Sequence, residues 1–151
     1  VPVGFGVSGS TAVIFLGVLI ASGTLYTAAA GNAERISEAS DAESEELLDR
    51  RNTVIDATEV VYNNNTTTLT VTVVNDGSTT LSVEDASLLV DNEYVQPSER
   101  STTVDGDTDT DVWAPDTDLV FETTRSSTPS RVKVVAENGV AASNTTIEEV
   151  S

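Results

Sequence analysis

Carboxylates recur at every second position in one short segment of the chain. They are Asp105, Asp107, Asp109 and Asp111. Calcium binds several carboxylate and carbonyl oxygens, and an EF-hand loop begins with a similar alternation. The rest of that pattern is missing, because the sixth loop position is Thr110 instead of glycine and the twelfth is Asp116 instead of glutamate. The four aspartates are therefore a calcium candidate, and the alternative is a solvated acidic loop.

The composition argues against an enzyme. The chain has no histidine and no cysteine, so the usual general base, the preferred zinc ligands and a thiolate nucleophile are all missing. A carboxylate pair could still act, but none stands out among the 25 acidic residues. A tethered hydrolase or solute-binding protein would need a pocket of converging polar groups, and no such set is recognisable. We interpret the chain as a binding or structural protein without a cofactor.

Three asparagines have the sequence context of N-glycosylation acceptors. Asn64, Asn65 and Asn144 each begin an Asn-X-Thr triplet. Such triplets suit an exported domain, although they also arise by chance in a chain rich in asparagine and threonine. The three residues are glycosylation candidates.

The charged residues are confined to one part of the chain. All 7 basic and 25 acidic residues lie at or after Glu34, and residues 1–33 are uncharged and largely apolar. A transmembrane helix needs about 20 predominantly apolar residues, which residues 5–30 supply. A buried core helix rarely runs this long without a charge, and a cleaved secretory signal has a basic region and a shorter apolar core. We predict a retained membrane anchor over residues 1–33.

Small residues follow one face of this predicted anchor. They are Gly6, Ser10, Gly17, Ala21, Thr24 and Ala28. Spacing of this kind lets a second helix approach closely, whether from another copy or from a different protein. The alternative is that membrane helices are simply rich in small residues.

The sequence pattern changes after the anchor. Residues 34–52 stay helical, because Ala, Glu, Leu and Arg dominate and neither proline nor glycine interrupts them. Their apolar stripe is narrow, which is typical of a stalk. From Thr53 onward apolar residues alternate with polar ones between clusters of turn residues. Seven or so short strands without helices predict an all-β immunoglobulin-like sandwich over residues 53–151.

Two turns and four aromatic residues stand out in the predicted sandwich. Residues 91–93 are expected at a hairpin tip, and Asn138-Gly139 is the strongest hairpin signal in the chain. We expect the aromatic side chains to anchor the core or one rim of it, since large rings contribute most buried area in a small domain, and a binding role is the alternative. They are Tyr62, Tyr94, Trp113 and Phe121.

The net charge of −18 limits the partners of the chain. Nucleic acid and anionic lipid headgroups both require basic patches, so neither is expected to bind. The acidity suits a protein kept soluble in high salt, where the Debye length falls to about 3 Å at 1 M. We expect a halophilic source and a protein partner.

Five segments resemble a known family. They read GFGVSGSTA at residues 4–12, LDRRNT at 48–53, TTLSV at 79–83, VDNEYV at 90–95 and PSRVKVV at 129–135. These segments are similar to the archaellum accessory protein family FlaF (ArlF) of haloarchaea, and the resemblance covers most of the chain. It is a match of pattern, and none of the segments is a catalytic motif.

The resemblance implies a single-pass protein of the cell membrane whose sandwich lies outside the cell. It further implies contact with the S-layer protein, dimerisation through the sandwich, and a stator formed with a FlaG-like partner for the archaellum motor. The alternative is a pilin-like filament subunit of an archaeal type IV pilus or archaellum, since those subunits also join an apolar helix to an external β domain. Such subunits usually carry a carboxylate early in the helix, whereas this chain has Phe5 there and no acid before Glu34.

Overall fold

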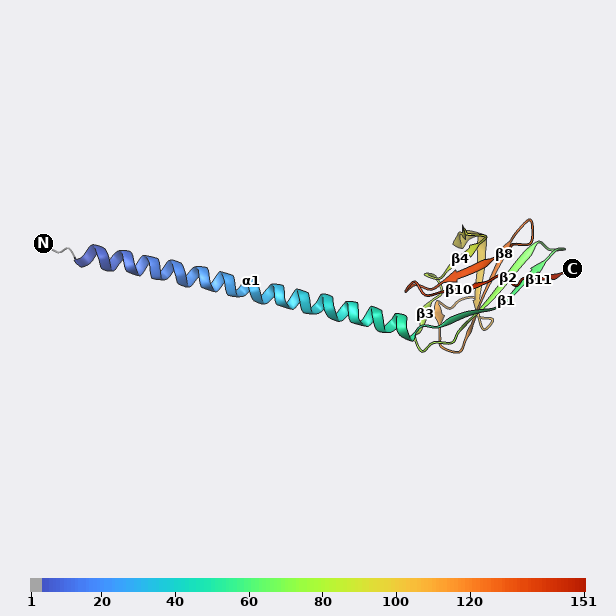
Figure 1. The fold of residues 1–151 in the computed structure, drawn as a ribbon, viewed down its shortest axis with the longest axis horizontal. Coiled ribbons are helices and arrows are strands. Elements are labelled where there is room, and N and C mark those ends of the chain that lie inside the picture. The colour runs from blue at the N-terminus through green and yellow to red at the C-terminus, as the bar shows by residue number, and fades with distance from the viewer. Residues whose placement is uncertain (1–3) are drawn as a thin grey trace. The chain divides into compact units, whose positions relative to one another are not determined.

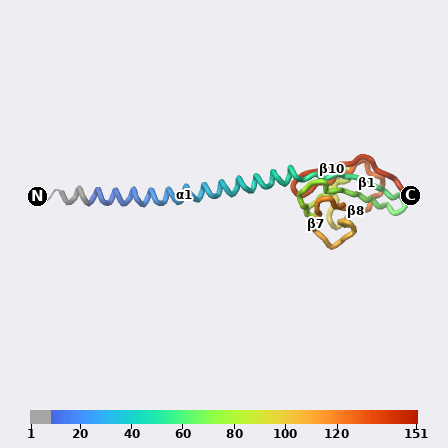
Figure 2. The backbone as a smooth tube through the Cα atoms, turned by 90° about the horizontal axis from the view of Figure 1, so that it is seen from below, coloured from blue at the N-terminus to red at the C-terminus, as the bar shows by residue number. Residues whose placement is uncertain are grey.

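The uncharged N-terminal segment begins one long helix. In the computed structural model, which describes residues 4–151 and their side chains from Gly9 onward, α1 runs without interruption from Gly4 to Asn52 (Figures 1 and 2). The predicted anchor and stalk are thus parts of a single helix. The chain divides into two compact units between Glu45 and Glu46, so the last turns of α1 belong to the sandwich unit. The boundary between anchor and stalk after residue 33 stays a prediction.

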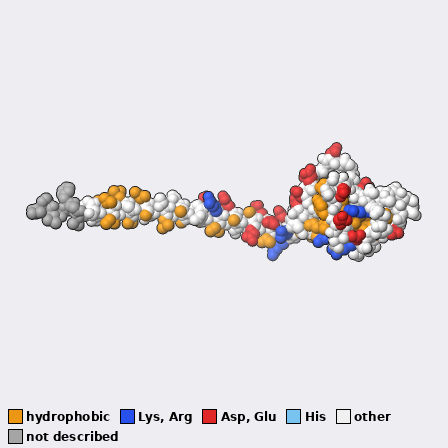
Figure 3. Space-filling model, turned by 90° about the horizontal axis from the view of Figure 1, so that it is seen from above, with side chains coloured by type: hydrophobic (Ala, Val, Ile, Leu, Met, Phe, Trp, Pro, Cys, Tyr) orange, Lys and Arg blue, Asp and Glu red, His pale blue; other side chains and the backbone are white. Residues whose placement is uncertain are grey.

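The first unit exposes its apolar side chains. One helix in the described part of the chain is long and apolar enough to cross a membrane, and side chains such as Ile14, Phe15 and Leu25 are exposed. Figure 3 shows hydrophobic side chains along the N-terminal part of α1 and acidic ones along its C-terminal part. The hydroxyl groups of Ser22 and Thr27 donate to carbonyl oxygens within the helix. Internal pairing of this kind is what the interior of a bilayer demands of polar groups.

The larger sheet of the sandwich has five strands in the order β11-β1-β2-β8-β6. Their bounds are Ile55–Asn63 for β1, Thr68–Asn75 for β2, Arg100–Val104 for β6, Asp118–Thr124 for β8 and Glu148–Val150 for β11. Neighbouring strands are antiparallel except that β11 runs parallel to β1. The strands β6 and β11 therefore form the two edges of this sheet.

The second sheet has four strands in the order β10-β9-β4-β5, and β3 and β7 form a separate two-stranded sheet. The bounds are Leu81–Ser82 for β3, Ser87–Val90 for β4, Glu93–Val95 for β5, Val112–Trp113 for β7, Val132–Val135 for β9 and Ala141–Asn144 for β10. A single 3₁₀ turn, η1 (Pro97–Glu99), links β5 to β6. The all-β sandwich predicted from the sequence is confirmed.

Alternating side chains of both sheets form one apolar core. On β2 every second residue is buried, including Leu69, Val71 and Val73, as expected for a strand with one face inward. Trp113, Tyr62 and Phe121 are among the largest fully buried side chains, as predicted. Tyr94 is not part of this core. Its side chain is 49% exposed, because Val95 takes the inward position on the short strand β5.

Both predicted hairpin turns are present. Asp91 and Asn92 have positive φ values of 50° and 70° between β4 and β5, the backbone that a tight two-residue hairpin needs. Gly139 has a φ of 83° between β9 and β10. The sequence did not predict β6, η1 or β11.

Candidate functional site

The last turn of α1 is fixed to the sandwich by hydrogen bonds within the second unit. The backbone N–H of Ser78 donates to the carbonyl oxygen of Asn52 at 2.8 Å. The hydroxyls of Thr53 and Thr79 both donate to the carbonyl oxygen of Asp49, at 2.6 and 3.3 Å. The final carbonyls of a helix have no partner within it, so here the loop after β2 supplies donors for them.

The amide of Asn138 extends this joint to the other sheet. Its Nδ2 donates to Thr53 Oγ1 at 2.7 Å, and Asn138 lies in the turn between β9 and β10. Thr53 is itself buried. One threonine therefore links the end of α1 to a hairpin of the four-stranded sheet.

Beneath the joint, Asn75 is a completely buried polar residue. Its Nδ2 donates to the carbonyl oxygens of Thr79 and Trp113 at 2.9 and 3.2 Å, and its Oδ1 accepts from the N–H of Gly77 at 3.1 Å. A buried amide costs free energy unless its donors and acceptors are paired, and all of these groups are. Asn75 therefore holds the loop that meets Asn52.

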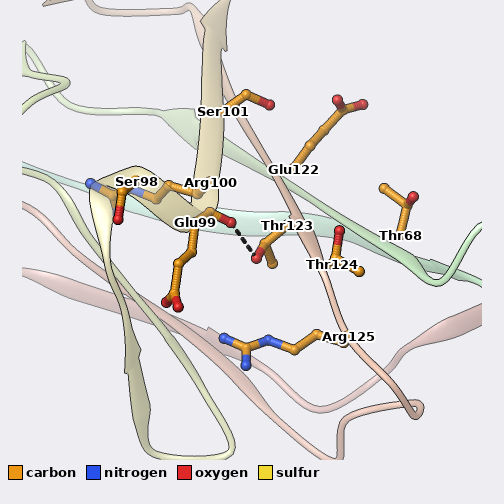
Figure 4. Close-up of a pocket in the computed structure, with 9 residues that line it drawn as sticks. All are labelled: Thr68, Ser98, Glu99, Arg100, Ser101, Glu122, Thr123, Thr124 and Arg125. Atoms are coloured by element: carbon orange, nitrogen blue, oxygen red, sulfur yellow. Dashed lines mark hydrogen bonds between the residues drawn. The ribbon is translucent and has the colours of Figure 1, made fainter.

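A second region of interest is a polar hollow of about 620 Å³ at the start of β6 and the end of β8. Its lining residues are Thr68, Ser98, Glu99, Arg100, Ser101, Glu122, Thr123, Thr124 and Arg125. Figure 4 shows the Arg125 side chain extending toward Glu99, while the hydroxyl of Thr123 donates to the carbonyl oxygen of Glu99 at 2.8 Å. The hollow offers hydrogen-bond donors and acceptors, but no nucleophile paired with a base.

Two arginines of this hollow lack carboxylate partners. In residues 4–151, the ion pair found within 4.0 Å joins Arg50 to Glu46 on α1, and neither Arg100 nor Arg125 takes part in one. One nitrogen of each guanidinium, Arg100 Nη1 and Arg125 Nε, is buried without a hydrogen-bond partner. The backbone of Arg125 is nevertheless fixed, since its N–H donates to Thr67 and its carbonyl accepts from the Tyr62 hydroxyl.

The Arg100 guanidinium contacts two other residues of the sandwich. Its Nη2 donates to the carbonyl oxygen of Ala86 at 2.6 Å, and its guanidinium carbon lies 5.0 Å from the centre of the Phe121 ring. Burial lowers the pKa of the Arg100 guanidinium from its ordinary value, and Tyr94 opposes that shift. The group stays charged at physiological pH, and stacking on the aromatic face stabilises it.

The four aspartates of the calcium candidate do not converge. No group of three or more acidic side chains that could hold a metal occurs among residues 4–151. Three of the carboxylates accept hydrogen bonds from within the sandwich: Asp105 from the N–H of Asp118, Asp107 from the N–H of Asp109, and Asp111 from the hydroxyl of Ser82 and the N–H of Glu84. The calcium candidate and its alternative, a solvated acidic loop, both stay predictions.

The glycosylation candidates fall in two different environments. Asn64 and Asn65 are exposed in the turn between β1 and β2. Asn144 is half-buried at the end of β10, where its Nδ2 donates to the carbonyl oxygen of Ala57 at 2.9 Å and its Oδ1 accepts from the N–H of Thr146 at 2.8 Å. The structure thus gives Asn144 a role in joining β10 to β1.

The model of the archaeal-type flagellin family matches residues 4–146, nearly the whole chain. The chain belongs to the archaeal-type flagellin family. It is therefore an archaellum-related protein, in agreement with the coarser part of the resemblance seen in the sequence. No curated protein matches it.

Solved structures with a similar arrangement of strands include two of archaellum proteins. The periplasmic stator protein FlaG from Sulfolobus acidocaldarius is 18% identical, with a TM-score of 0.44 over 61% of this chain and 97% of that one. The periplasmic stator complex of FlaF and FlaG from the same organism is 14% identical, with a TM-score of 0.43 over 60% of this chain and 85% of that one. The ligand-binding region of the serine-glutamate repeat protein A of Enterococcus faecium is 12% identical, with a TM-score of 0.38 over 66% of this chain and 98% of that one.

For this member of the archaeal-type flagellin family, the small residues of the anchor lie on α1 in the first unit. There is open space beside Gly17. A Cβ atom added there would have no atom within 4 Å apart from the nearby helix backbone. Ala21, Thr24 and Ala28 are exposed, as is Ser10. The exposure of Gly6 is outside what the structure describes. The packing role of this face stays a prediction.

Proposed function

We propose that this chain is a non-enzymatic structural component of the archaeal motility machinery, which anchors the archaellum motor to the S-layer as part of a stator. In this role the apolar part of α1 is a single-pass anchor in the cell membrane. The sandwich lies in the pseudoperiplasmic or extracellular space, where it contacts the S-layer protein and a FlaG-like partner. The resemblance of five segments to FlaF supports this proposal, and membership of the archaeal-type flagellin family agrees with a part in the archaellum.

The observation that carries the proposal is the joint between the last turn of α1 and the sandwich. A stator must resist torque, so a flexible linker between anchor and surface domain would be a weak point. Here the carbonyls of Asp49 and Asn52 are bonded to the loop after β2, and Thr53 leads directly into β1. Such a joint suits a protein whose work is mechanical.

The uncharged anchor favours a stator over a filament subunit. Every acidic residue lies at or after Glu34, so the apolar helix carries no carboxylate that could pair with a neighbouring subunit in a filament core. The sandwich also stays acidic, and in high salt its self-repulsion is screened. An acidic sandwich of this kind is better suited to bind other proteins than nucleic acid or anionic lipid headgroups.

A pilin-like filament subunit is the second candidate. It is favoured by the family match itself, which is to archaeal-type flagellins, and by the unbroken helix Gly4–Asn52. In that case the apolar helices would pack together as the core of a filament. Electron microscopy of the full chain after removal of detergent decides between the two, because filaments with a helical core would establish the second candidate.

The stator proposal is tested by binding. The full chain in detergent is immobilised and offered S-layer protein from the same cells in molar salt, with an unrelated acidic protein as the control. We expect specific capture of the S-layer protein, and capture of neither protein would refute the anchoring role. Light scattering of the purified chain tests the dimer that the resemblance implies.

A further inference from the structure

The edge strand β6 has backbone groups that face away from its sheet. The N–H of Asp105 donates to Asp118 on β8, whereas the N–H of Val104 donates outward to Asp107. Inward and outward groups alternate along an antiparallel strand. With the register Arg100↔Thr123 and Thr102↔Phe121, the N–H and C=O of Arg100 and Thr102 must therefore point away from β8.

The residues that carry these outward groups line a groove. A hollow of about 510 Å³ is lined by Arg100 and Thr102 from β6, and its other walls include Glu84, Asp85 and Asp109. Ser101 and Thr103, whose backbone groups turn toward β8, do not line it. The polar hollow of Figure 4 adjoins the same strand at its beginning, since Arg100 lines both. Two hollows therefore flank one free strand edge.

We propose that an extended, basic segment of a partner protein adds to β6 as a further strand, and that its Lys or Arg side chains enter the acidic groove. Strand addition uses the main chain for affinity and neighbouring hollows for side-chain specificity. The inference deepens the proposed function, on which it rests for the existence of a protein partner. It concerns the stretch from Arg100 to Thr102, because the loop at Asp107 covers the edge at Val104.

The charge of the groove selects the occupant. Glu84, Asp85 and Asp109 are exposed carboxylates, and Asp111 is held by Ser82 and Glu84. Arg100 is the single basic residue of the lining. Its Nη2 donates to the carbonyl oxygen of Ala86 and its guanidinium lies over the Phe121 ring, while its Nη1 is buried without a hydrogen-bond partner. An acidic segment would therefore be repelled, whereas a basic one gains attraction along with backbone hydrogen bonds.

The other sheet edges are less suited to a new strand. The strands β11 and β5 have three residues each, and each carries glutamate. Charged side chains on short edge strands are a common protection against unwanted pairing. The edge of β10 lies against β1, to which Asn144 is bonded through Ala57. By contrast, β6 has five residues and none of them is acidic.

The test uses the full chain in detergent and a short synthetic peptide in which lysine and threonine alternate, with a glutamate-threonine peptide as control. We expect the lysine peptide to bind and the glutamate peptide not to bind. Thr102→Pro removes an outward N–H, a change that an edge strand tolerates. It should weaken binding about tenfold, as expected when a backbone hydrogen bond is lost.

Charge variants separate strand addition in the groove from general attraction to an acidic protein. Glu84→Gln with Asp109→Asn should weaken peptide binding about three- to tenfold. The matched control, Glu148→Gln with Glu149→Gln on β11, removes two charges at the opposite edge of the same sheet and should leave binding unchanged.

Three results would overturn the inference: no binding of the lysine peptide, equal binding by Thr102→Pro, or equal losses in the two charge variants. If Thr102→Pro does not fold, as judged by circular dichroism, the comparison of charge variants decides. S-layer protein is absent from this experiment. A failure here with intact S-layer capture would thus reject the β6 surface alone, and failed capture would reject the stator proposal.

Discussion

A Cβ atom at Gly77 would collide with the carbonyl oxygen of Asn52, the last residue of α1. The same atom would lie 2.6 Å from the backbone nitrogen of Val54. These neighbours are backbone atoms and cannot rotate away as a side chain could. Gly77 has no positive φ, so glycine is required here by close approach. The loop after β2 can reach the end of the helix because this position has no side chain.

Replacing Gly77 by alanine should therefore loosen the joint. We expect Gly77→Ala to lower the free energy of unfolding of the sandwich by about 1 to 3 kcal/mol, as overpacking does in a well-packed site. Denaturant unfolding followed by the fluorescence of Trp113 measures this, because the one tryptophan of the chain is buried in the sandwich core.

The neighbouring exposed residue supplies the control for this change. Asp76→Ala alters the same loop without entering the joint and should change the free energy of unfolding by no more than about 0.5 kcal/mol. Equal unfolding curves for Gly77→Ala and the unmodified protein would show that the loop can move away from Asn52 at no cost.

Asn75 offers a test that depends on pH. In Asn75→Asp the carboxyl group would face the carbonyl oxygens of Thr79 and Trp113, which now accept from Nδ2. Burial and these oxygens disfavour the charged form, so the folded pKa of the new group should lie above its unfolded value of about 3.9. The neutral form is then retained in the folded state, and stability should fall as the pH rises above about 4.

The measurement is the denaturant midpoint of Asn75→Asp at several pH values. Asn65→Asp is the matched control, because Asn65 is exposed in the turn after β1. Only the variant at the buried position should lose stability relative to the unmodified protein as the pH rises. Parallel pH profiles for the two variants would mean that the site at Asn75 admits a solvated charge.

Much of the fold could be predicted from the sequence, because its strongest patterns are local. An apolar run without a charge predicts the helix, and alternation of valine with threonine predicts β2. The pair Asn138-Gly139 predicts its own turn. By contrast β6, with the sequence RSTTV, has little apolar alternation and is a strand because it pairs with β8.

The joint and the edge groove could not be predicted, since both depend on residues distant in the sequence. In the sequence, Asn75 and Gly77 belong to an ordinary stretch of turn residues, and nothing local shows that Asn52 lies against Gly77. Arg100 and Arg125 lie beside the same hollow because β6 pairs with β8. The one hint in the sequence was that basic residues are scarce, since the chain has 7 of them against 25 acidic residues.

The two groups of glycosylation candidates should behave differently. If the sandwich is exported, we expect glycan on the exposed turn that holds Asn64 and Asn65 and none on Asn144, whose Nδ2 is bonded to Ala57. Mass spectrometry of the protein from its own cells tests this. Changing both Thr66 and Thr67 to alanine removes the two overlapping triplets and should remove the glycan mass.

Thr146→Ala is the control, since it removes only the triplet at Asn144. The mass of this variant should differ from that of the unmodified protein by the threonine-to-alanine change alone. A glycopeptide that contains Asn144 would contradict the structural role given to its side chain. Asn144→Ala should instead destabilise the sandwich by about 1 to 3 kcal/mol, because the carbonyl of Ala57 would lose its donor.

The face of small residues on α1 can be tested with two alanines on opposite sides of the helix. With 3.6 residues per turn, Ala21 lies on the same side as Gly17 and Thr24, and Ala12 lies on the other side. If a second helix packs against this face, Ala21→Leu should weaken association in detergent about tenfold, because the larger side chain holds the backbones apart. Ala12→Leu adds the same bulk and should leave association unchanged. Sedimentation of both variants measures the difference, and equal association constants would assign the small residues to membrane-helix composition alone.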